Sequence, residues 1–400
     1  MKKKLLCMAL AAAMALSLCA CGSDDGSSAD TSTDTGTDSG TTSTATGAAF
    51  KIGGTGPLTG DAAIYGVAAK NGAQIAVDEI NALGGDIQFD LRYEDDVNDP
   101  EKAVNAYNTL KDWGMQLSLG SVTSKPGEAT TVENNADRIF ALTPSASSQA
   151  NIEGKDNVFQ MCFMDPNQGS ASARYIDEQD LGTKIAIIWK NDDVYSKGIH
   201  DKFVEEAESR GLEIVSDTTF ATGNDTDFSV QVADAQTNGA DLVFLPIYYQ
   251  PASLILAQAD KVGYTPKWFG VDGMDGILTM EGFDPTLAEG VMLLTPFNAD
   301  ADDEKTQAFV TKYQEQFGET PNQFAADAYD CIYAYYEALT NAKATPDMDA
   351  ETLCGLMQEQ FTTMTFSGLT GTEVTWDATG AVSKEPKGMV IQNGAYVGMD

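Results

Sequence analysis

The fold is set by two short apolar runs, Leu119-Gly-Ser-Val-Thr-Ser124 and Ile139-Phe-Ala-Leu-Thr-Pro-Ser-Ala-Ser-Ser148, which both end in small hydroxylated residues. Parallel sheets bind ligands in the crevice beyond the carboxyl ends of their strands. If both runs are parallel strands, two serine-lined loops lie side by side at one edge of a sheet. The sequence therefore predicts a site of hydroxyl and backbone N–H groups, with no Arg, Lys or His at either strand end.

Apolar segments on either side of this stretch alternate with segments of helical spacing, such as Ser253–Val262. The first series of predicted strands is Phe50–Thr55, Ile87–Glu94, Met115–Leu119, Ile139–Leu142 and Val158–Met161. The second series is Lys184–Trp189, Glu213–Phe220, Asp241–Ile247, Lys267–Gly270 and Gly290–Thr295. Three more helices and short strands, at Val374–Trp376 and within Lys387–Val397, complete the chain. Strict strand–helix alternation is typical of parallel sheets with helices on both faces, so we predict an α/β protein with two doubly wound lobes.

The first residues have the pattern of a bacterial export signal. A basic segment, Lys2–Lys4, precedes the apolar run Leu5–Leu18, which is too short to span a membrane comfortably. The following Leu18-Cys-Ala-Cys21 resembles the cleavage motif of lipoprotein signals, and Cys21 is the better lipid acceptor because a small residue precedes it. We predict a signal peptide at residues 1–20 and a lipid anchor at Cys21, on the extracytoplasmic face of the cell membrane. An ordinary secretory signal is the alternative.

The segment after Cys21 differs in composition from the rest of the chain. Residues 22–47 are almost all Ser, Thr, Gly, Asp and Ala, a composition that cannot bury a core, so we predict a disordered tether at residues 21–48. The net charge of −36 argues against nucleic acid as a partner, because phosphates require Lys and Arg. Only three cysteines follow Cys21, which predicts buried thiols and no disulfide framework.

Catalytic and cofactor motifs are weak. The single histidine, His200, falls inside a predicted helix, where a surface position is the ordinary expectation. The glycine-rich loop Gly53–Gly60 does not follow the dinucleotide pattern, and Pro57 removes an N–H donor where a phosphate would need one. No Cys/His cluster predicts zinc, and pairs such as Asp347 and Asp349 lack the remaining features of a calcium loop. We predict no enzymatic activity, no metal and no cofactor.

A set of polar and aromatic residues recurs at or near the ends of successive predicted strands: Tyr65, Ser124, Ser145, Ser147, Tyr195, Tyr248 and Asp272. Phe324 opens a later helix. Taken singly, the aromatic residues are more often part of a core than of a site. Their recurrence at one kind of position favours a binding cleft as strongly as a core.

The order of motifs from Phe50 onward resembles the leucine/isoleucine/valine-binding proteins of ABC importers, which have the periplasmic-binding protein type I fold. The motifs that carry this resemblance are Ile52–Gly60 with Tyr65-Gly66, Asn71–Gly85, Tyr93–Pro100, Leu119–Ser124, Thr143–Ser147, Ile185–Ile188, Tyr195, Tyr248 and Phe269–Gly273. The resemblance implies two lobes joined by a hinge of three chain crossovers. The two lobes would close around a ligand by movement at this hinge. The resemblance places the crossovers near Met161–Asp165, Thr295–Pro296 and Gly368–Trp376. The first lobe would contain residues 49–163 and 297–372, and the second residues 164–296 and 373–400.

The resemblance also implies a role for individual residues. The ligand carboxylate would meet Ser124 and backbone N–H groups of the Ser145-Ala146-Ser147 segment. The ligand ammonium would meet Asp272, the Ser147 hydroxyl and the Ser145 carbonyl, although family members commonly have the longer Glu at position 272. Tyr195 would cover the main-chain end of the ligand, and the side-chain pocket would be walled by Tyr65, Val122, Thr123, Tyr248 and Phe324. A family disulfide would fall at about Asn98 and Thr123, neither of which is Cys here, and Thr123 adds a hydroxyl to the wall.

These implications predict a monomeric, lipid-anchored solute-binding protein that delivers an amino acid, branched-chain or otherwise apolar, to an ABC permease. A small amide or an aromatic acid is the alternative ligand. A sensor module for a receptor and an exported α/β hydrolase or oxidoreductase are alternatives of other classes.

Overall fold

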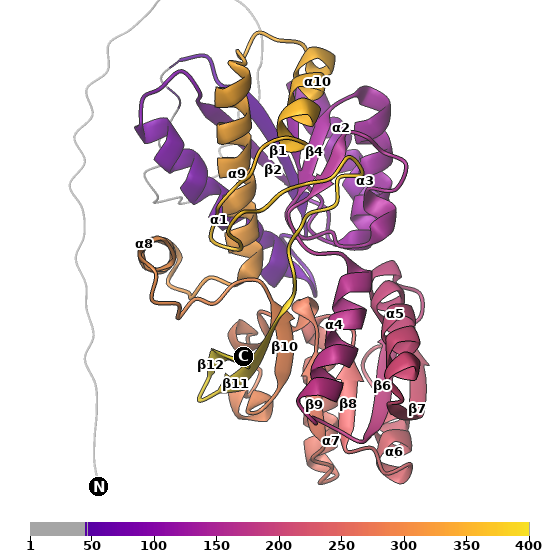
Figure 1. Cartoon of the computed structure of the whole chain (residues 1–400). Helices are drawn as coiled ribbons and strands as arrows, with labels where there is room; N and C mark the ends of the chain where they lie inside the picture. Colours follow the sequence, from indigo (N-terminus) through magenta and orange to yellow (C-terminus); the bar gives the residue numbers. More distant parts are fainter. Residues whose placement is uncertain (1–44, 46, 400) are drawn as a thin grey trace, which may run out of the picture. The chain divides into compact units, whose positions relative to one another are not determined.

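A computed structural model describes residue 45 and residues 47–399 of the chain. The predicted signal peptide, Cys21 and most of the predicted tether lie outside these residues. The described chain contains two sheets with helices on both faces, so the predicted fold class is confirmed (Figure 1). Within the described part, no helix is long and apolar enough to cross a membrane.

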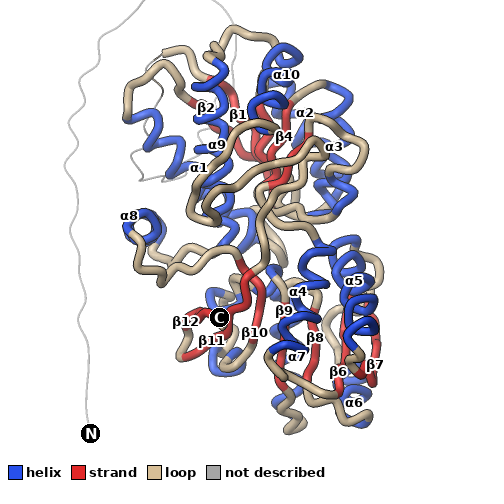
Figure 2. Tube along the Cα trace, in the orientation of Figure 1, coloured by secondary structure: helices blue, strands red, loops and turns tan. Residues whose placement is uncertain are grey.

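The first sheet has five parallel strands in the order β2-β1-β3-β4-β5. Figure 2 shows its strands in red, with β1, β2 and β4 labelled. These strands are β1 (Phe50–Gly56), β2 (Phe89–Asp95), β3 (Leu117–Leu119), β4 (Phe140–Thr143) and β5 (Val158–Gln160). Their connecting helices are α1 (Ala63–Ala82), α2 (Pro100–Trp113) and α3 (Ser124–Asp137). Because β2 and β3 lie on opposite sides of β1, right-handed crossovers place α1 on one face and α2 with α3 on the other.

Three later helices complete this first lobe: α8 (Glu304–Phe317), α9 (Gln323–Ala342) and α10 (Ala350–Phe361). Helix α9 packs along α1, and Gly72 is what allows the close approach. A Cβ atom at Gly72 would lie 2.0 Å from the carbonyl oxygen of Ala325 on α9. The close contact between α1 and α9 therefore depends on Gly72 having no side chain.

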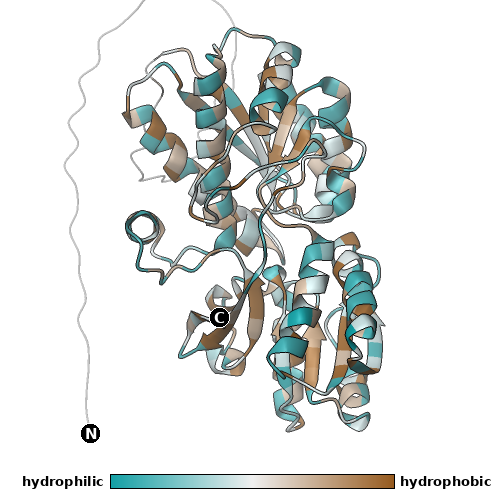
Figure 3. Ribbon diagram, viewed as in Figure 1, coloured by the Kyte–Doolittle hydropathy of each residue, from teal (hydrophilic) through white to brown (hydrophobic). Residues whose placement is uncertain are grey.

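The second sheet has seven strands in the order β12-β11-β10-β9-β8-β6-β7, of which β11 and β12 are antiparallel additions at one edge. The strands are β6 (Lys184–Lys190), β7 (Glu213–Phe220), β8 (Leu242–Leu245), β9 (Lys267–Gly270), β10 (Met292–Thr295), β11 (Lys387–Gln392) and β12 (Ala395–Gly398). The helices of this second lobe are α4 (Asp165–Glu178), α5 (Val194–Arg210), α6 (Ser229–Thr237) and α7 (Tyr249–Lys261). Figure 3 shows hydrophobic strands covered by helices with hydrophilic outer faces, the pattern of a buried parallel sheet.

Short 3₁₀ turns follow β9, at η2 (Asp272–Met274), η3 (Ile277–Thr279) and η4 (Pro285–Ala288), and η1 (Gln149–Asn151) follows β4. Helix α2 begins at Pro100, because the Asp99 carboxylate accepts a hydrogen bond from the Lys102 N–H and Pro100 occupies the first turn. Helix α7 begins at Tyr249, four residues before the predicted Ser253. Pro251 is tolerated there because first-turn N–H groups have no partner within the helix.

The chain passes between the two sheets three times. The first two passages follow β5 and β10. After α10, the chain stays with the first sheet, where the Trp376 Nε1–H donates to the Gln160 carbonyl at 2.7 Å and the Gln160 N–H donates to the Gly380 carbonyl at 3.0 Å. It joins the second sheet only at Lys387, later than the passage predicted at 368–376, because the indole of Trp376 is buried against Phe361 of α10.

The predicted strand Val374–Trp376 does not form. Val374 and Trp376 make only isolated antiparallel bridges, to Phe366 and Val382. Beyond them, the Lys384 ammonium is buried and lies 2.9 Å from the Asp327 carboxylate of α9, which ties this part of the passage to the first lobe. The assignment of exact lobe boundaries stays a prediction.

Candidate functional site

The residues singled out from the sequence follow the carboxyl ends of strands in both sheets. In the first lobe they follow β1, β3 and β4, and in the second they follow β6, β8 and β9. Contacts across the lobes bring part of the set together, because the Tyr65 ring lies 5.3 Å from the Tyr248 ring. The Tyr248 ring lies 4.8 Å from Tyr195, whose hydroxyl donates to the Asp272 carboxylate at 2.6 Å.

The two serine loops lie side by side, as predicted from the strand pattern. The Ser124 hydroxyl oxygen accepts hydrogen bonds from the N–H groups of Ser147 and Ser148, both at 3.1 Å. The Ser145 hydroxyl donates to the Val122 carbonyl at 2.6 Å. Ser124 therefore still has a hydroxyl proton to donate, whereas the Ser147 N–H expected for a ligand is already bonded to Ser124.

Hydrogen bonds from a side chain of β5 hold the backbone of the second serine loop in place. The Gln160 side chain of β5 donates to the Ala146 carbonyl at 2.8 Å and to the Ser148 carbonyl at 3.2 Å. The Ala146 methyl group faces α3, since a Cβ atom at Gly127 would lie 2.9 Å from it. Ala146 is thus held as backbone, and its side chain belongs to the packing of α3.

Asp272 is the best-anchored carboxylate of the set. It is 4% exposed, its N–H donates to the Gln168 amide oxygen at 3.1 Å, and its carbonyl accepts from the Gln323 amide at 2.8 Å. Burial raises the pKa of its carboxyl to about 7, and the hydrogen bond from Tyr195 partly offsets this rise. None of these bonded groups is a cation, and the Asp272 carboxylate has no positive partner among the described residues.

Two glutamines and one aspartate near this carboxylate were not identified from the sequence. Gln168 and Gln323 hold the backbone of Asp272 from α4 and α9, and the Gln323 N–H also donates to Asp275 in the same turn at 2.9 Å. Asp165 begins α4 and is 1% exposed. Asp165 and Gln168 follow the end of β5, and Gln323 precedes the predicted site residue Phe324. The search for polar residues after strand ends could have found all three, had it included β5 and the sequence neighbours of the predicted site residues.

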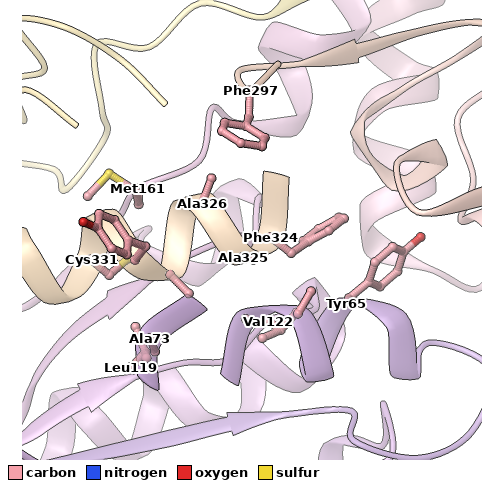
Figure 4. Close-up of a cluster of buried hydrophobic side chains, with 14 of the residues drawn as sticks. Tyr65, Ala73, Leu119, Val122, Met161, Phe297, Phe324, Ala325, Ala326 and Cys331 are labelled. Atoms are coloured by element: carbon pink, nitrogen blue, oxygen red, sulfur yellow. The ribbon is translucent and has the colours of Figure 1, made fainter. Parts of the chain in front are cut away.

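Tyr65 forms the centre of an aromatic wall. Its ring lies 4.3 Å from Phe324 and 5.0 Å from Tyr249, and Figure 4 shows Tyr65, Phe324 and Val122 in one buried cluster. Its hydroxyl donates to the Gly273 carbonyl and accepts from the Tyr249 N–H at 3.2 Å. Tyr65 therefore contributes an apolar surface and two hydrogen bonds to the other lobe, and Tyr249 is a wall residue that the sequence did not single out.

Thr123 behaves differently from the other wall residues. It lies at the N-terminus of α3, is 3% exposed, and its hydroxyl has no hydrogen-bond partner among the described residues. Val122 beside it is buried and apolar. The wall is thus hydrophobic with one buried hydroxyl that a ligand or a water molecule would have to satisfy.

A cavity of about 300 Å³ is lined by Tyr195 and Tyr248 but not by the other predicted site residues, the serine loops and Asp272 among them. Its rim carries charges of both signs, including Asp61 in the first lobe, Lys125 on α3 and Lys190 at the end of β6. The Lys125 ammonium also donates to the Asp192 carbonyl across the cleft at 3.4 Å. This volume lies at the lower end of the range of small-ligand pockets.

His200 is more buried than the sequence suggested. It is 8% exposed, stacks on Trp189 at 4.0 Å, and its two ring nitrogens contact Asp201 and Asp217. His200 is buried because α5 packs against β6 and β7. No described group of three or more His, Cys, Asp or Glu residues has the geometry of a metal site, and Cys162, Cys331 and Cys354 are buried thiols.

A family model described as periplasmic binding protein matches residues 49–394 of the chain. The chain belongs to the periplasmic binding protein family. The predicted resemblance is confirmed, and the family is one of solute-binding proteins and not of enzymes.

Relatives with assigned names point to one class. The chain is 31% identical over 234 residues to the Leu/Ile/Val-binding protein BraC3 of Rhizobium johnstonii. This alignment covers 57% of this chain and 62% of BraC3, which is less than two thirds of the length of that protein. It is 25% identical over 307 residues to the leucine-, isoleucine-, valine-, threonine-, and alanine-binding protein of Pseudomonas aeruginosa, covering 76% and 81%. A solved structure of LivJ from Streptococcus pneumoniae, in complex with isoleucine, superposes with a TM-score of 0.78 at 27% identity over 87% of this chain and 97% of that one.

Proposed function

We propose that this protein captures an amino acid, branched-chain or otherwise apolar, between the serine loops and Asp272, and delivers it to an ABC permease. The observation that carries the proposal is the separation of polar groups in the cleft. Hydroxyl groups and a helix N-terminus lie on the first lobe, and a buried carboxylate without a cationic partner lies on the second. A zwitterion with adjacent carboxylate and ammonium groups is complementary to this arrangement.

The aromatic wall supports an apolar side chain. Tyr65, Tyr248 and Phe324 offer ring surfaces, and Val122 adds an aliphatic one. A hydrophobic wall with few polar groups selects by shape and by the loss of water-exposed apolar area. Thr123 supports a pocket that also tolerates a small polar group.

Capture by hinge closure fits the contacts between the lobes. Tyr65 of α1 bonds to Gly273 and Tyr249 of the second lobe, and Gln323 of α9 bonds to Asp272. These bonds would break when the lobes separate and form again around a ligand. The closed form would therefore be stabilised jointly by the ligand and by these protein contacts.

An aromatic acid without an ammonium group is the second candidate, and the rings around Tyr65 favour it. Asp272 opposes it, because a carboxylate ligand would meet a buried carboxyl group and gain no ion pair. Isothermal titration calorimetry of the full chain in detergent, with L-leucine, L-isoleucine, L-valine, L-alanine, L-glutamate and benzoate, separates the two. We expect the apolar amino acids to bind most tightly, and binding of benzoate alone would refute the amino-acid proposal.

We also propose that the chain acts as a monomer held on the membrane by a lipid at Cys21, through the segment of residues 21–48. The pattern of Leu18 to Cys21 supports this anchor, and the composition of the following segment supports a flexible connection. The test is partition in Triton X-114. Full-length protein from bacterial membranes should enter the detergent phase, and a Cys21→Ser variant should remain in the aqueous phase. Aqueous partition of both would contradict lipidation.

A further inference from the structure

The only histidine of the chain lies between two carboxylates. The His200 Nδ1 atom is 3.0 Å from an oxygen of Asp201, and its Nε2 atom is 3.1 Å from an oxygen of Asp217. A neutral imidazole has one N–H donor and one bare nitrogen, which can only accept a hydrogen bond. An ionised carboxylate is also only an acceptor, so a neutral ring would set its bare nitrogen against one of the two carboxylates. Only the imidazolium form donates to both.

Each of the two carboxylates has a further donor in the protein. The Trp189 Nε1–H donates to the second oxygen of Asp217 at 2.8 Å. The Lys197 ammonium forms an ion pair with Asp201 one turn along α5. Burial opposes ionisation of the Asp201 carboxyl, but the hydrogen bonds from Lys197 and His200 lower its pKa below the ordinary value. Both carboxylates therefore act as acceptors in this cluster, and the bond to each of them requires an N–H group of the histidine.

The imidazole ring is enclosed, whereas its acidic partners reach solvent. The side chain of His200 is 10% exposed, and those of Asp217 and Asp201 are 41% and 52% exposed. The ring stacks on Trp189, with 4.0 Å between the centroids and 17° between the planes. A cation over the face of a tryptophan is attracted by the charge distribution of the indole, so the stack also favours the imidazolium. Burial by itself lowers the pKa of His200, but the hydrogen bonds with Asp217 and Asp201 outweigh burial and raise this pKa above its ordinary value.

His200 connects three elements of the second lobe. It belongs to α5, its stacking partner Trp189 belongs to β6, and Asp217 belongs to β7, the edge strand of the second sheet (Figure 1). Helix α5 also carries Tyr195 in its first turn, and the Tyr195 hydroxyl donates to Asp272. The bonds at His200 thus hold α5 on the sheet about one and a half turns from Tyr195. A change in the charge of the ring would act on the support of this helix.

We propose that His200 is a pH-sensitive tie, held as an imidazolium between Asp201 and Asp217, that fixes α5 to the second sheet. When the ring releases its proton to water, one carboxylate loses its donor and meets a bare nitrogen, so the tie weakens as the pH rises. The charged groups of the tie are Asp201 and Lys197 on α5 and Asp217 on β7. From β6, Trp189 adds a ring but no charge. This inference goes beyond the proposed function, because it concerns the unliganded protein and requires no amino acid.

Nuclear magnetic resonance measures the protonation of this ring directly, because His200 gives the only histidine signal of the chain. The full chain in detergent, purified with a tag that contains no histidine, is titrated from pH 5 to 9 in the folded state and again when unfolded in urea. The variant Asp217→Asn removes one of the two charges. The matched control is Glu213→Gln, which removes an exposed acid at the start of the same strand.

We expect the pKa of His200 to be higher in the folded chain than in the unfolded chain, to fall in Asp217→Asn, and to stay at the wild-type value in Glu213→Gln. A group that binds its proton more tightly when folded stabilises the protein below its unfolded pKa, and this gain is lost as the pH rises through the folded pKa. The stability difference between the wild type and His200→Gln should therefore be largest near pH 5 and should shrink towards pH 9. Buried acids such as Asp272 titrate in both proteins and cancel in this difference. Hydrogen exchange at pH 6 should be faster in α5 of His200→Gln than in α5 of the wild type, and equal in α9.

Several results would overturn the inference. A folded pKa equal to or below the unfolded one would show that the carboxylates do not hold the proton, and this measurement needs no variant. An unchanged pKa in Asp217→Asn would show the same for that carboxylate. A stability difference between the wild type and His200→Gln that is equal at pH 5 and pH 9 would reduce His200 to a packing residue. Equal exchange of α5 in these two proteins would show that the ring does not fix the helix.

Discussion

Replacement of Asp272 by Asn has two opposite effects that can be worked out from its surroundings. The side chain keeps its shape and an oxygen for the Tyr195 hydroxyl, but it loses the charge that would face the ligand. Loss of a hydrogen bond between charged groups costs about 2 to 3 kcal/mol, so L-leucine affinity should fall about 30- to 150-fold.

The same substitution should stabilise the unliganded protein. Burial raises the pKa of Asp272 from its ordinary value near 4 to about 7, so above pH 7 the ionised side chain destabilises the folded state by up to roughly 4 kcal/mol. The amide removes this penalty, and the variant should therefore melt at a higher temperature than the wild type at pH 8. Below about pH 4 the gain should vanish, because the carboxyl is then neutral in both states.

Calorimetry with L-leucine and thermal unfolding without it measure the two effects on one preparation. The matched control is Asp260→Asn, since Asp260 is an exposed acid on α7 of the same lobe. The reasoning is refuted if Asp272→Asn binds L-leucine as tightly as the control does. It is also refuted if binding is lost together with a lower melting temperature, because that pattern belongs to a structural residue.

L-leucine affinity should fall about tenfold for each pH unit below 7, because Asp272 takes up the proton that ammonium binding must displace. The neighbouring carboxyl groups of Asp165 and Asp193, whose pKa values are also raised by burial, would modify the slope. A flat affinity profile from pH 5 to 8 in calorimetry would contradict this. Tyr65→Phe should weaken L-leucine binding by about 1 to 2 kcal/mol, because two hydrogen bonds to the second lobe are lost while the ring remains. An unchanged dissociation constant would show that these bonds do not support closure. Gly72→Ala should destabilise the protein by about 2 kcal/mol or more, because its Cβ would meet a backbone carbonyl of α9. In chemical unfolding, Gly355→Ala on the exposed face of α10 should be neutral or stabilising, and equal effects of the two alanines would refute the packing argument.

Local sequence signals were sufficient for most of the fold. Strand β7 at Glu213–Phe220 and strand β9 at Lys267–Gly270 have the predicted bounds. In each case the apolar periodicity and the flanking residues indicate the same bounds, and tertiary packing does not change them. Strand β8 is shorter than predicted because Pro246, which has no N–H to donate, follows its last residue.

The third passage between the sheets was placed too early because its position depends on contacts distant in sequence. Trp376 reaches the carbonyl of Gln160 on β5, and Lys384 reaches Asp327 on α9. Neither partner is visible in the local pattern of residues 366–386. A buried ion pair and a buried indole together keep this segment on the first lobe.

The candidate site likewise contains residues that local sequence signals predicted and residues that they did not. Ser124, Ser145 and Asp272 were found because each follows a strand, and topology alone brings strand ends to one edge. Asp165 and Gln323 were missed because their place near the site depends on burial and on hydrogen bonds to distant residues. Such contacts arise only when helices and loops from both lobes meet.

The measurement that bears most directly on the account is a crystal structure of the full chain with L-leucine bound at pH 7.5. The account predicts the leucine ammonium within hydrogen-bond distance of Asp272, the carboxylate at the Ser124 hydroxyl, and the side chain against Tyr65. Leucine in the reverse orientation, or bound away from these residues, would contradict it.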